Sequence, residues 1–166
     1  SVLGVIALVG SVAYVLAVHE MKRTAFKLQR KTLAALRGAY QWDSLHVDST
    51  GLGTQLAEEL VEAWGESEVT PVQFTAPAKE SLVTGAFRWL AANALRFPLD
   101  DSGAALADEG KSIHRTITTS GNVSYTAPSI EGSHADRWTA LCLALAGAGE
   151  PRAHRGVSTS PLVQPQ

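Results

Sequence analysis

Two aspartates separated by most of the chain are the residues best suited to carry out chemistry. Asp48 ends the apolar run of residues 45–47, and Asp136 stands at the head of an apolar segment. Hard divalent cations such as Mg²⁺ prefer carboxylate oxygens, and two-metal cleavage of a phosphodiester needs carboxylates that converge from several elements. If the fold brings these two side chains together, they form most of a metal site.

Each aspartate also has a purely structural explanation. Asp48 can accept a hydrogen bond from the backbone of a turn at Thr50 and Gly51. Asp136 completes a Ser-x-x-Asp pattern with Ser133, a variant of the capping box that begins many helices. Taken singly, each residue favours the structural explanation. Together they favour a site, because Asp48 follows a strand at the end where open α/β sheets bind ligands.

Length and composition set the frame for these residues. The chain has 166 residues, 45% of them hydrophobic, which is enough for one domain with a real core. A formal net charge of −2 gives no overall attraction to nucleic acid, so a DNA contact must come from a local basic patch. The single cysteine, Cys142, lies among leucines and excludes an internal disulfide, so we interpret it as a core residue in a reducing compartment. The opening Ser1 suggests a piece cut from a longer protein.

The apolar run of residues 2–18 allows two interpretations. It carries no charge and ends before Lys22 and Arg23, as a membrane anchor with a positive flank would. However, it is barely as long as the roughly 20 residues that a spanning helix needs, and it is rich in Val and Ile. Gly10 and Ser11 also interrupt it. Two buried strands joined by a tight turn fit better.

Helical and extended patterns alternate along the rest of the chain. Helical patterns cover residues 26–36, 50–64, 77–90, about 104–109 and about 134–148. Extended patterns cover residues 45–48 and 69–74. Residues 116–119 and 123–126 are predicted to form a hairpin around Ser120, Gly121 and Asn122. The alternation predicts an α/β domain over residues 1–148 with parallel strands at its core. Residues 149–166, rich in Pro, Ser and Gln, are predicted to be a disordered tail.

Residues 105–112 match a relaxed phosphate-loop pattern that ends in Gly110, Lys111 and Ser112. A phosphate cradle needs a flexible glycine loop after a strand, whereas this segment favours a helix. It also places Asp108 and Glu109 where phosphates would lie. We therefore expect no nucleotide site here.

Several local sequences, in their order, resemble the C-terminal nuclease domain of tailed-phage terminase large subunits. The resemblance spans nearly all of residues 1–148, and no single piece of it is specific. Its central piece is Asp48-Ser49-Thr50-Gly51-Leu52-Gly53. The other carriers are residues 45–47, 72–75, Lys79 and Glu80, 95–98, 125–128 and 134–144.

The resemblance implies a ribonuclease H-like fold, which is a mixed sheet flanked by helices, here with a small β-hairpin. It implies that Asp48 and Asp136 bind Mg²⁺ or Mn²⁺ and cut concatemeric double-stranded DNA during capsid filling. The implied partners are the portal protein and the small terminase subunit, in the host cell cytoplasm and without a membrane. The family's first catalytic aspartate precedes the hairpin that begins here at Ser1, and this chain has no counterpart. We therefore expect the first central strand to be missing, and the piece to hold metal poorly and to be inactive alone.

Basic side chains around the two aspartates are candidates for phosphate contacts. In the family a lysine often stands where Lys79 does here, and the others flank the predicted hairpin or Asp136. These candidates are Lys79, Lys111, Arg115, His134 and Arg137. A solvated surface charge is the alternative for each of them. The hairpin itself, residues 115–126, is expected to help seat the duplex.

Two other functions stay open beside the nuclease. One is a catalytically degenerate ribonuclease H-like module that serves only for docking, for instance to the portal through the tail. The other is a small membrane-anchored protein with an unrelated soluble part. An aspartate shortly upstream of Ser1 would favour the nuclease over the docking module, and solubility without detergent would argue against the anchor.

Overall fold

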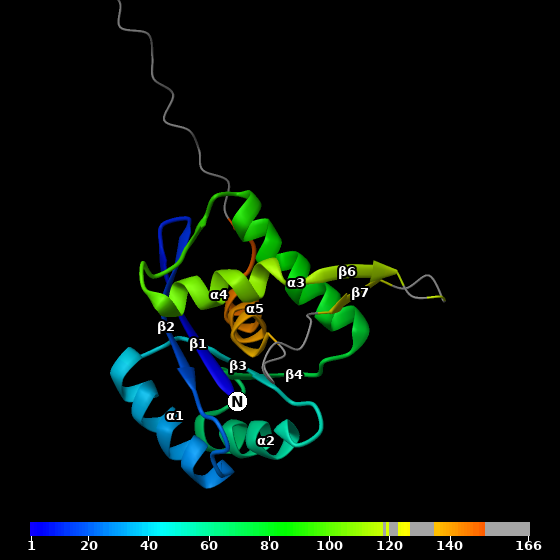
Figure 1. Cartoon of the computed structure of the whole chain (residues 1–166). Coiled ribbons are helices and arrows are strands. Elements are labelled where there is room, and N and C mark those ends of the chain that lie inside the picture. The colour runs from blue at the N-terminus through cyan, green and yellow to red at the C-terminus, as the bar shows by residue number, and fades with distance from the viewer. Residues whose placement is uncertain (118, 120–122, 127–134, 152–166) are drawn as a thin grey trace, which may run out of the picture.

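The computed structural model of the chain describes residues 1–117, 119, 123–126 and 135–151. Helices and strands alternate along these residues, as Figure 1 shows. The strands are β1 (Val2–Val9), β2 (Val12–Glu20), β3 (Leu45–Asp48), β4 (Val69–Val72), β5 (Leu95–Arg96), β6 (His114–Ile117) and β7 (Val123–Thr126). The helices are α1 (Phe26–Tyr40), α2 (Gly53–Trp64), α3 (Ala76–Ala91), α4 (Asp101–Lys111) and α5 (Asp136–Ala148).

The apolar start of the chain forms a hairpin of two strands. β1 and β2 pair antiparallel from Val9 opposite Val12 to Val2 opposite Glu20, with a register shift beside Val5. Gly10, in the turn, has a φ of 62°, a conformation that costs glycine little. The run that resembled a membrane anchor is therefore strand, and no helix among the described residues is both long and apolar enough to span a bilayer.

Parallel pairs complete the expected mixed sheet. β3 and β4 pair in parallel from Leu45 opposite Val69 to Asp48 opposite Val72, with α2 as the crossover between them. The short strand β5 pairs in parallel with β2, where Ala13 lies opposite Leu95. The α/β class predicted from the sequence, with its mixed pairing of strands, is confirmed.

Among the described strands, the sheet is divided into two parts. One part has the order β1-β2-β5 and the other is β3-β4, and no ladder joins β1 to β3. Helix α5 nevertheless packs against both β1 and β3, so it bridges the two parts. A cleft of about 420 Å³ is lined by β1 on one side and by Leu45 and His46 of β3 on the other. The sheet is thus open at its centre, where the missing strand was expected.

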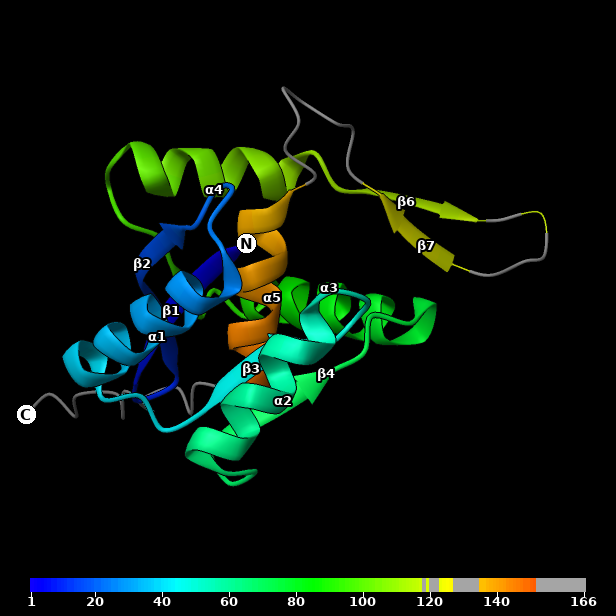
Figure 2. The ribbon, with the colours of Figure 1, turned by 90° about the horizontal axis from the view of Figure 1, so that it is seen from below.

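Two hydrophobic cores lie on opposite faces of this divided sheet. Helices α1 and α2 cover one face, while α3, α4 and α5 lie on the other (Figures 1 and 2). The core under α1 and α2 joins Leu3 of β1 to Leu45 of β3. The core under α3 to α5 centres on Trp138 and Leu141, and it includes Cys142, which is 2% exposed as expected of a core residue. Burial raises the pKa of the Cys142 thiol to about 12.

Several element boundaries differ from those predicted. Helix α2 begins at Gly53 rather than Thr50, because the residues after Asp48 form a turn. Strand β4 ends at Val72, since the Thr75 hydroxyl already caps α3 by accepting a hydrogen bond from the Ala78 N–H. The segment that resembled a phosphate loop lies mostly within α4, whose N-cap is Asp100, and is therefore not a glycine loop.

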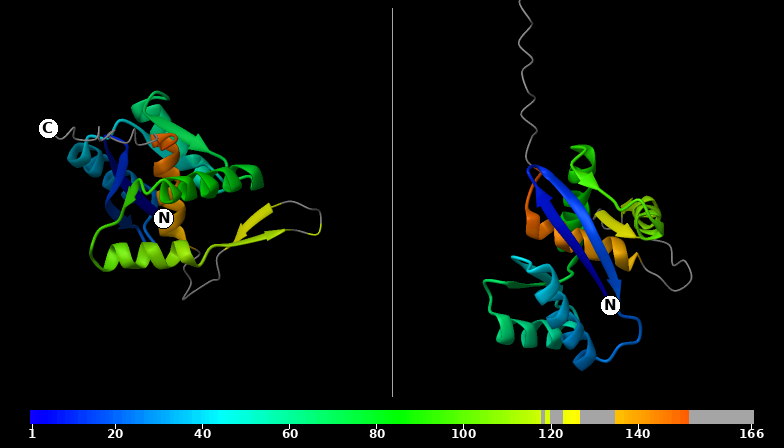
Figure 3. Two further views of the ribbon diagram at one scale, coloured as in Figure 1. Left: turned by 90° about the horizontal axis from the view of Figure 1, so that it is seen from above. Right: turned by 90° about the vertical axis from the view of Figure 1, so that its left-hand side faces the viewer.

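Strands β6 and β7 form the predicted hairpin, which begins two residues earlier than expected. Their register runs from His114 opposite Thr126 to Ile117 opposite Val123. The hairpin projects from the body of the molecule beyond α3, as Figure 2 and the left-hand view of Figure 3 show. The predicted turn residues 120–122 lie outside the described residues. So does most of the predicted tail, of which 149–151 are described.

Candidate functional site

A tight turn after β3 fixes the first aspartate. The Asp48 carboxylate is half-buried, and its Oδ1 accepts a hydrogen bond of 2.9 Å from the Thr50 N–H. Gly51 has a φ of 59°, and a Cβ on Gly53 would lie 2.3 Å from the Asp48 carbonyl oxygen. Both glycines of the Asp-x-Thr-Gly-x-Gly segment are therefore required by the backbone. The turn bond occupies one carboxylate oxygen and leaves capacity for a further ligand, because a carboxylate has about four lone-pair sites.

The same turn is bonded to the end of β4. The Ser49 N–H donates to the Val72 carbonyl at 2.9 Å, which continues the ladder one residue past Asp48. The Thr50 hydroxyl accepts a hydrogen bond of 2.8 Å from the Phe74 N–H. The turn is thus anchored from two sides, and the backbone that carries Asp48 has little freedom.

The second aspartate is the first residue of α5. The preceding residue, Ala135, is buried, has a left-handed backbone with a φ of 57°, and supplies no side-chain cap. Asp136 itself is exposed. Because Ala135 is the N-cap, Asp136 is not at the third helical position that the predicted capping box requires. Ser133, the other half of that pattern, lies outside the described residues.

Asp48 and Asp136 line the same cleft, although they are 88 positions apart along the chain. The cleft has a volume of about 730 Å³ and lies among the end of β3, the start of α5, the start of β1 and helices α1 to α3. Lys79 of α3 and Phe74 also line it. The structure therefore places the two aspartates and one of the predicted basic residues along the same cleft.

Of the basic candidates that the structure describes, only Lys79 lines this cleft. The Lys79 ammonium lies 5.8 Å from the centroid of the Phe74 ring, a cation–π distance that holds it at the rim. Lys111 forms an exposed ion pair of 2.9 Å with Asp108, and Arg115 is exposed on β6. Arg137 is bound by two carboxylates. His134 lies outside the described residues.

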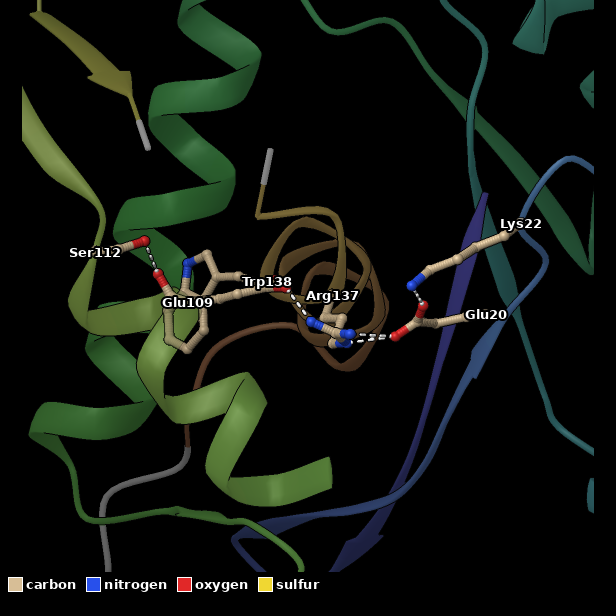
Figure 4. A network of polar contacts seen from close by, with 6 residues as sticks. All are labelled: Glu20, Lys22, Glu109, Ser112, Arg137 and Trp138. Atoms are coloured by element: carbon tan, nitrogen blue, oxygen red, sulfur yellow. Dashed lines mark hydrogen bonds and ion pairs between the residues drawn. The ribbon is translucent and has the colours of Figure 1, made fainter. Parts of the chain in front are cut away.

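The carboxylates that bind Arg137 were not singled out in the sequence. Glu20 ends β2 and Glu109 belongs to α4, and both reach the guanidinium (Figure 4). Burial alone would lower the pKa of Arg137, but the hydrogen bonds to Glu20 and Glu109 outweigh it and raise that pKa. The hydrogen bond from Lys22 is the main cause that lowers the pKa of Glu20. No sequence signal pairs these residues, because they come from three separate elements.

The two aspartates offer ligands that suit a hard cation, but they are few. Asp48 and Asp136 offer carboxylate oxygens, which are the ligands that Mg²⁺ and Mn²⁺ prefer. Within residues 1–117, 119, 123–126 and 135–151, no three His, Cys, Asp or Glu side chains gather closely enough to hold a metal ion. The described residues thus fit part of a metal site rather than a complete one.

Comparison with known proteins identifies the architecture. The family described as Terminase RNaseH-like domain matches residues 1–147. The chain belongs to this family. No curated protein sequence matches the chain.

Solved structures similar to this terminase RNase H-like domain come from phages. The large terminase nuclease of thermophilic phage G20c with bound magnesium is 25% identical, with a TM-score of 0.63 over 80% of this chain and 67% of that one. The same nuclease with bound cobalt is 22% identical, with a TM-score of 0.67, and the match covers 87% of this chain and 80% of that one. The large terminase nuclease domain of Thermus phage P74-26 is 18% identical, with a TM-score of 0.62 over 86% and 77%. These likenesses confirm the ribonuclease H-like fold predicted from the sequence.

Proposed function

We propose that this chain is part of the metal-dependent endonuclease of a phage DNA-packaging terminase large subunit, and that Asp48 and Asp136 are metal ligands in it. The observation that carries the proposal is the convergence of these two aspartates on one cleft of a terminase RNase H-like domain. The family match and the similar nucleases with bound magnesium and cobalt support a divalent cation.

The chain's own residues would divide the work between holding cations and holding DNA. Asp48 and Asp136 would bind two Mg²⁺ or Mn²⁺ ions together with a third carboxylate. Ions held there supply Lewis acidity, which activates water for attack and stabilises charge on the leaving oxygen. Lys79, at the rim of the same cleft, would contact a backbone phosphate of double-stranded DNA. Lys111, Arg115 and His134 stay candidates for further phosphate contacts.

The third carboxylate would arrive on a strand between β1 and β3. Those two strands face each other across open space, and α5 already packs against both. Gln29 of α1, which is 5% exposed, lines the larger cleft that also contains Asp48 and Asp136, and its side-chain Oε1 has no hydrogen-bond partner in the described structure. An inserted strand would bring backbone N–H groups to such an acceptor. Residues 1–166 alone would then bind metal weakly and cut no DNA.

This function places the domain with other components of DNA packaging. Its substrate would be concatemeric double-stranded DNA in the host cell cytoplasm. The portal protein and the small terminase subunit would be its partners in the intact terminase. The family match supports these partners only as a consequence of the packaging role.

The test is Mn²⁺-dependent cleavage of plasmid DNA by the intact terminase polypeptide that carries this domain. We expect Asp48→Ala and Asp136→Ala each to abolish cleavage, with a loss of at least about 1,000-fold if each aspartate is a direct ligand. Asp108→Ala is the matched control, because Asp108 is an exposed carboxylate outside the cleft, and it should cut normally. Full activity of either cleft variant would remove that residue from the site. A docking module would show no metal-dependent cleavage in any variant.

A further inference from the structure

The residue after Asp136 is held on both sides by carboxylates from distant elements. Arg137 donates from Nε to Glu20 Oε1 at 2.6 Å and from Nη1 to Glu109 Oε1 at 2.6 Å, and its Nη2 also pairs with Glu20. The three side chains are only 13–26% exposed. Figure 4 shows the guanidinium at the start of α5, with Glu20 of β2 on one side of it and Glu109 of α4 on the other. This bridge therefore ties the first turn of α5 to two neighbouring elements.

Glu109 also caps the helix that begins with Asp136. Its Oε2 accepts a hydrogen bond of 3.0 Å from the Trp138 N–H. The first N–H groups of a helix have no partner within the helix, and Ala135 offers no side chain to satisfy them. Glu109 of α4 thus supplies a cap that Ala135 cannot. Trp138, which follows the bridge, is 2% exposed and cannot shift without disturbing the core.

Among the described residues, each glutamate of this cluster has a cationic partner. Glu20 and Glu109 are matched by Arg137 and by Lys22, whose ammonium lies 2.9 Å from Glu20 Oε2. A cation near Asp136 would gain little from carboxylates that already have cationic partners. In the same way, a guanidinium with two carboxylate partners has few donors left for a DNA phosphate.

We propose that Arg137, Glu20 and Glu109 are positioning residues that set the Asp136 carboxylate against Asp48 in the metal site. The inference rests on the proposed function. Arg137, which the sequence suggested as a DNA contact, then acts through Asp136 rather than on a phosphate. Residues that orient metal ligands typically change metal affinity or activity about 10- to 100-fold when they are replaced.

The experiment measures cleavage by the intact terminase polypeptide as a function of Mn²⁺ concentration. Glu109→Gln keeps an acceptor for the Trp138 N–H but removes the negative charge that faces Arg137. Arg137→Lys keeps the positive charge but loses the planar guanidinium that binds both glutamates. For both variants we expect the Mn²⁺ concentration at half-maximal rate to rise about 10-fold or more, with the rate recovered at saturating Mn²⁺. Arg30→Gln breaks an exposed Arg–Glu pair between α1 and α2 and should change neither quantity.

DNA binding measured without metal separates the two roles of Arg137. A positioning role leaves the affinity for duplex DNA and its salt dependence unchanged in Arg137→Gln. If Arg137 contacts a phosphate, Arg137→Gln should bind duplex DNA more weakly, with a salt slope reduced by about one. That result would overturn the inference. An unchanged Mn²⁺ requirement in Glu109→Gln and Arg137→Lys would overturn it too, even if Arg137→Gln fails to fold. If the unsubstituted polypeptide shows no Mn²⁺-dependent cleavage at all, the proposed function fails instead, so the two failures can be told apart.

Discussion

The Asp48 carboxylate has two tasks that different substitutions can separate. Its Oδ1 accepts the Thr50 N–H at 2.9 Å, and the proposed function gives the same carboxylate a metal. Asp48→Asn keeps an oxygen for the turn but loses the negative charge, whereas Asp48→Ala loses both. We expect Asp48→Ala to lower the free energy of unfolding by about 1 kcal/mol and Asp48→Asn by clearly less. Urea unfolding measures this difference.

Metal-dependent cleavage should be lost in both Asp48 variants, although their stabilities differ. The charge of the carboxylate holds the cation, and a neutral amide is a much poorer partner for it. If Asp48→Asn cuts DNA at the unsubstituted rate, Asp48 serves the turn alone. The comparison thus decides between the two explanations that the sequence left open for this residue.

Cys142 provides a prediction that depends on pH. Burial raises the pKa of its thiol from 9.0 to about 12, so the folded chain keeps a proton that the unfolded chain releases between these values. The stability contribution of the protonated thiol is therefore complete below about pH 9 and is lost as the pH rises toward 12. Cys142→Ala should lack this alkaline loss.

Labelling of the Cys142 thiol near neutral pH gives the direct measurement. The native chain should react with an aromatic disulfide reagent far more slowly than the chain unfolded in guanidinium chloride, because only the thiolate attacks. Reaction of the native chain at the unfolded rate would show that the thiol is accessible, contrary to its 2% exposure.

At this scale the sequence predicted residue types better than their partners. Asp48 and Asp136 were identifiable because each carboxylate stands next to an apolar segment, at the end of a strand or at the head of a helix, where a charged side chain is unexpected. Glu20 and Glu109 were not, because one looked like the first charge after a strand and the other like part of a helix surface. Their role depends on contacts with Arg137 across 117 and 28 positions of the sequence.

Helices α4 and α5 pack closely at Gly110, so a larger residue there should destabilise the chain. A Cβ on Gly110 would lie 2.5 Å from an atom of the Trp138 ring, and that ring is 2% exposed. Gly110→Ala must therefore push α4 and α5 apart, at a cost of about 1–3 kcal/mol. Gly38→Ala in α1 is the matched control, because nothing lies within 4 Å of its Cβ.

The two glycine variants should change stability in opposite directions. Alanine is the better helix former by about 1 kcal/mol, so Gly38→Ala should stabilise the chain slightly. Thermal unfolding measures both effects. A Gly110→Ala variant as stable as Gly38→Ala would mean that the two helices do not meet at Gly110.

Periodicity predicted which elements exist, but it predicted their ends less well. The helix after β3 was expected at Thr50, yet the turn bonds of Asp48 and Thr50 delay it to Gly53. The two-residue strand β5 was not predicted as a strand, because a ladder of that length leaves no pattern in the sequence. In each case a local hydrogen bond or a tertiary pairing, rather than propensity, sets the boundary.

For the whole molecule, the resemblance to terminase nuclease domains predicted more of the architecture than composition or hydrophobic pattern did. Alternating strands and helices predicted an α/β domain, but only the order of the terminase-like segments indicated that the sheet would be open at its centre. Hydrophobic pattern gives no such signal, because β1 and β3 remain covered by α5 on one face and share a core with α1 and α2 on the other.

The open centre gives the last prediction, which concerns hydrogen exchange. In residues 1–166, the β1 amides that are not bonded to β2 face the cleft, so they should exchange quickly. In the intact terminase polypeptide, a strand seated between β1 and β3 would bond to them and slow their exchange. Strand β2 is the internal control, because it pairs with β1 on the side away from the open space and its amides should change little. Equal exchange of the β1 amides in both polypeptides would mean that no strand enters this space, and the third carboxylate would then have to come from elsewhere.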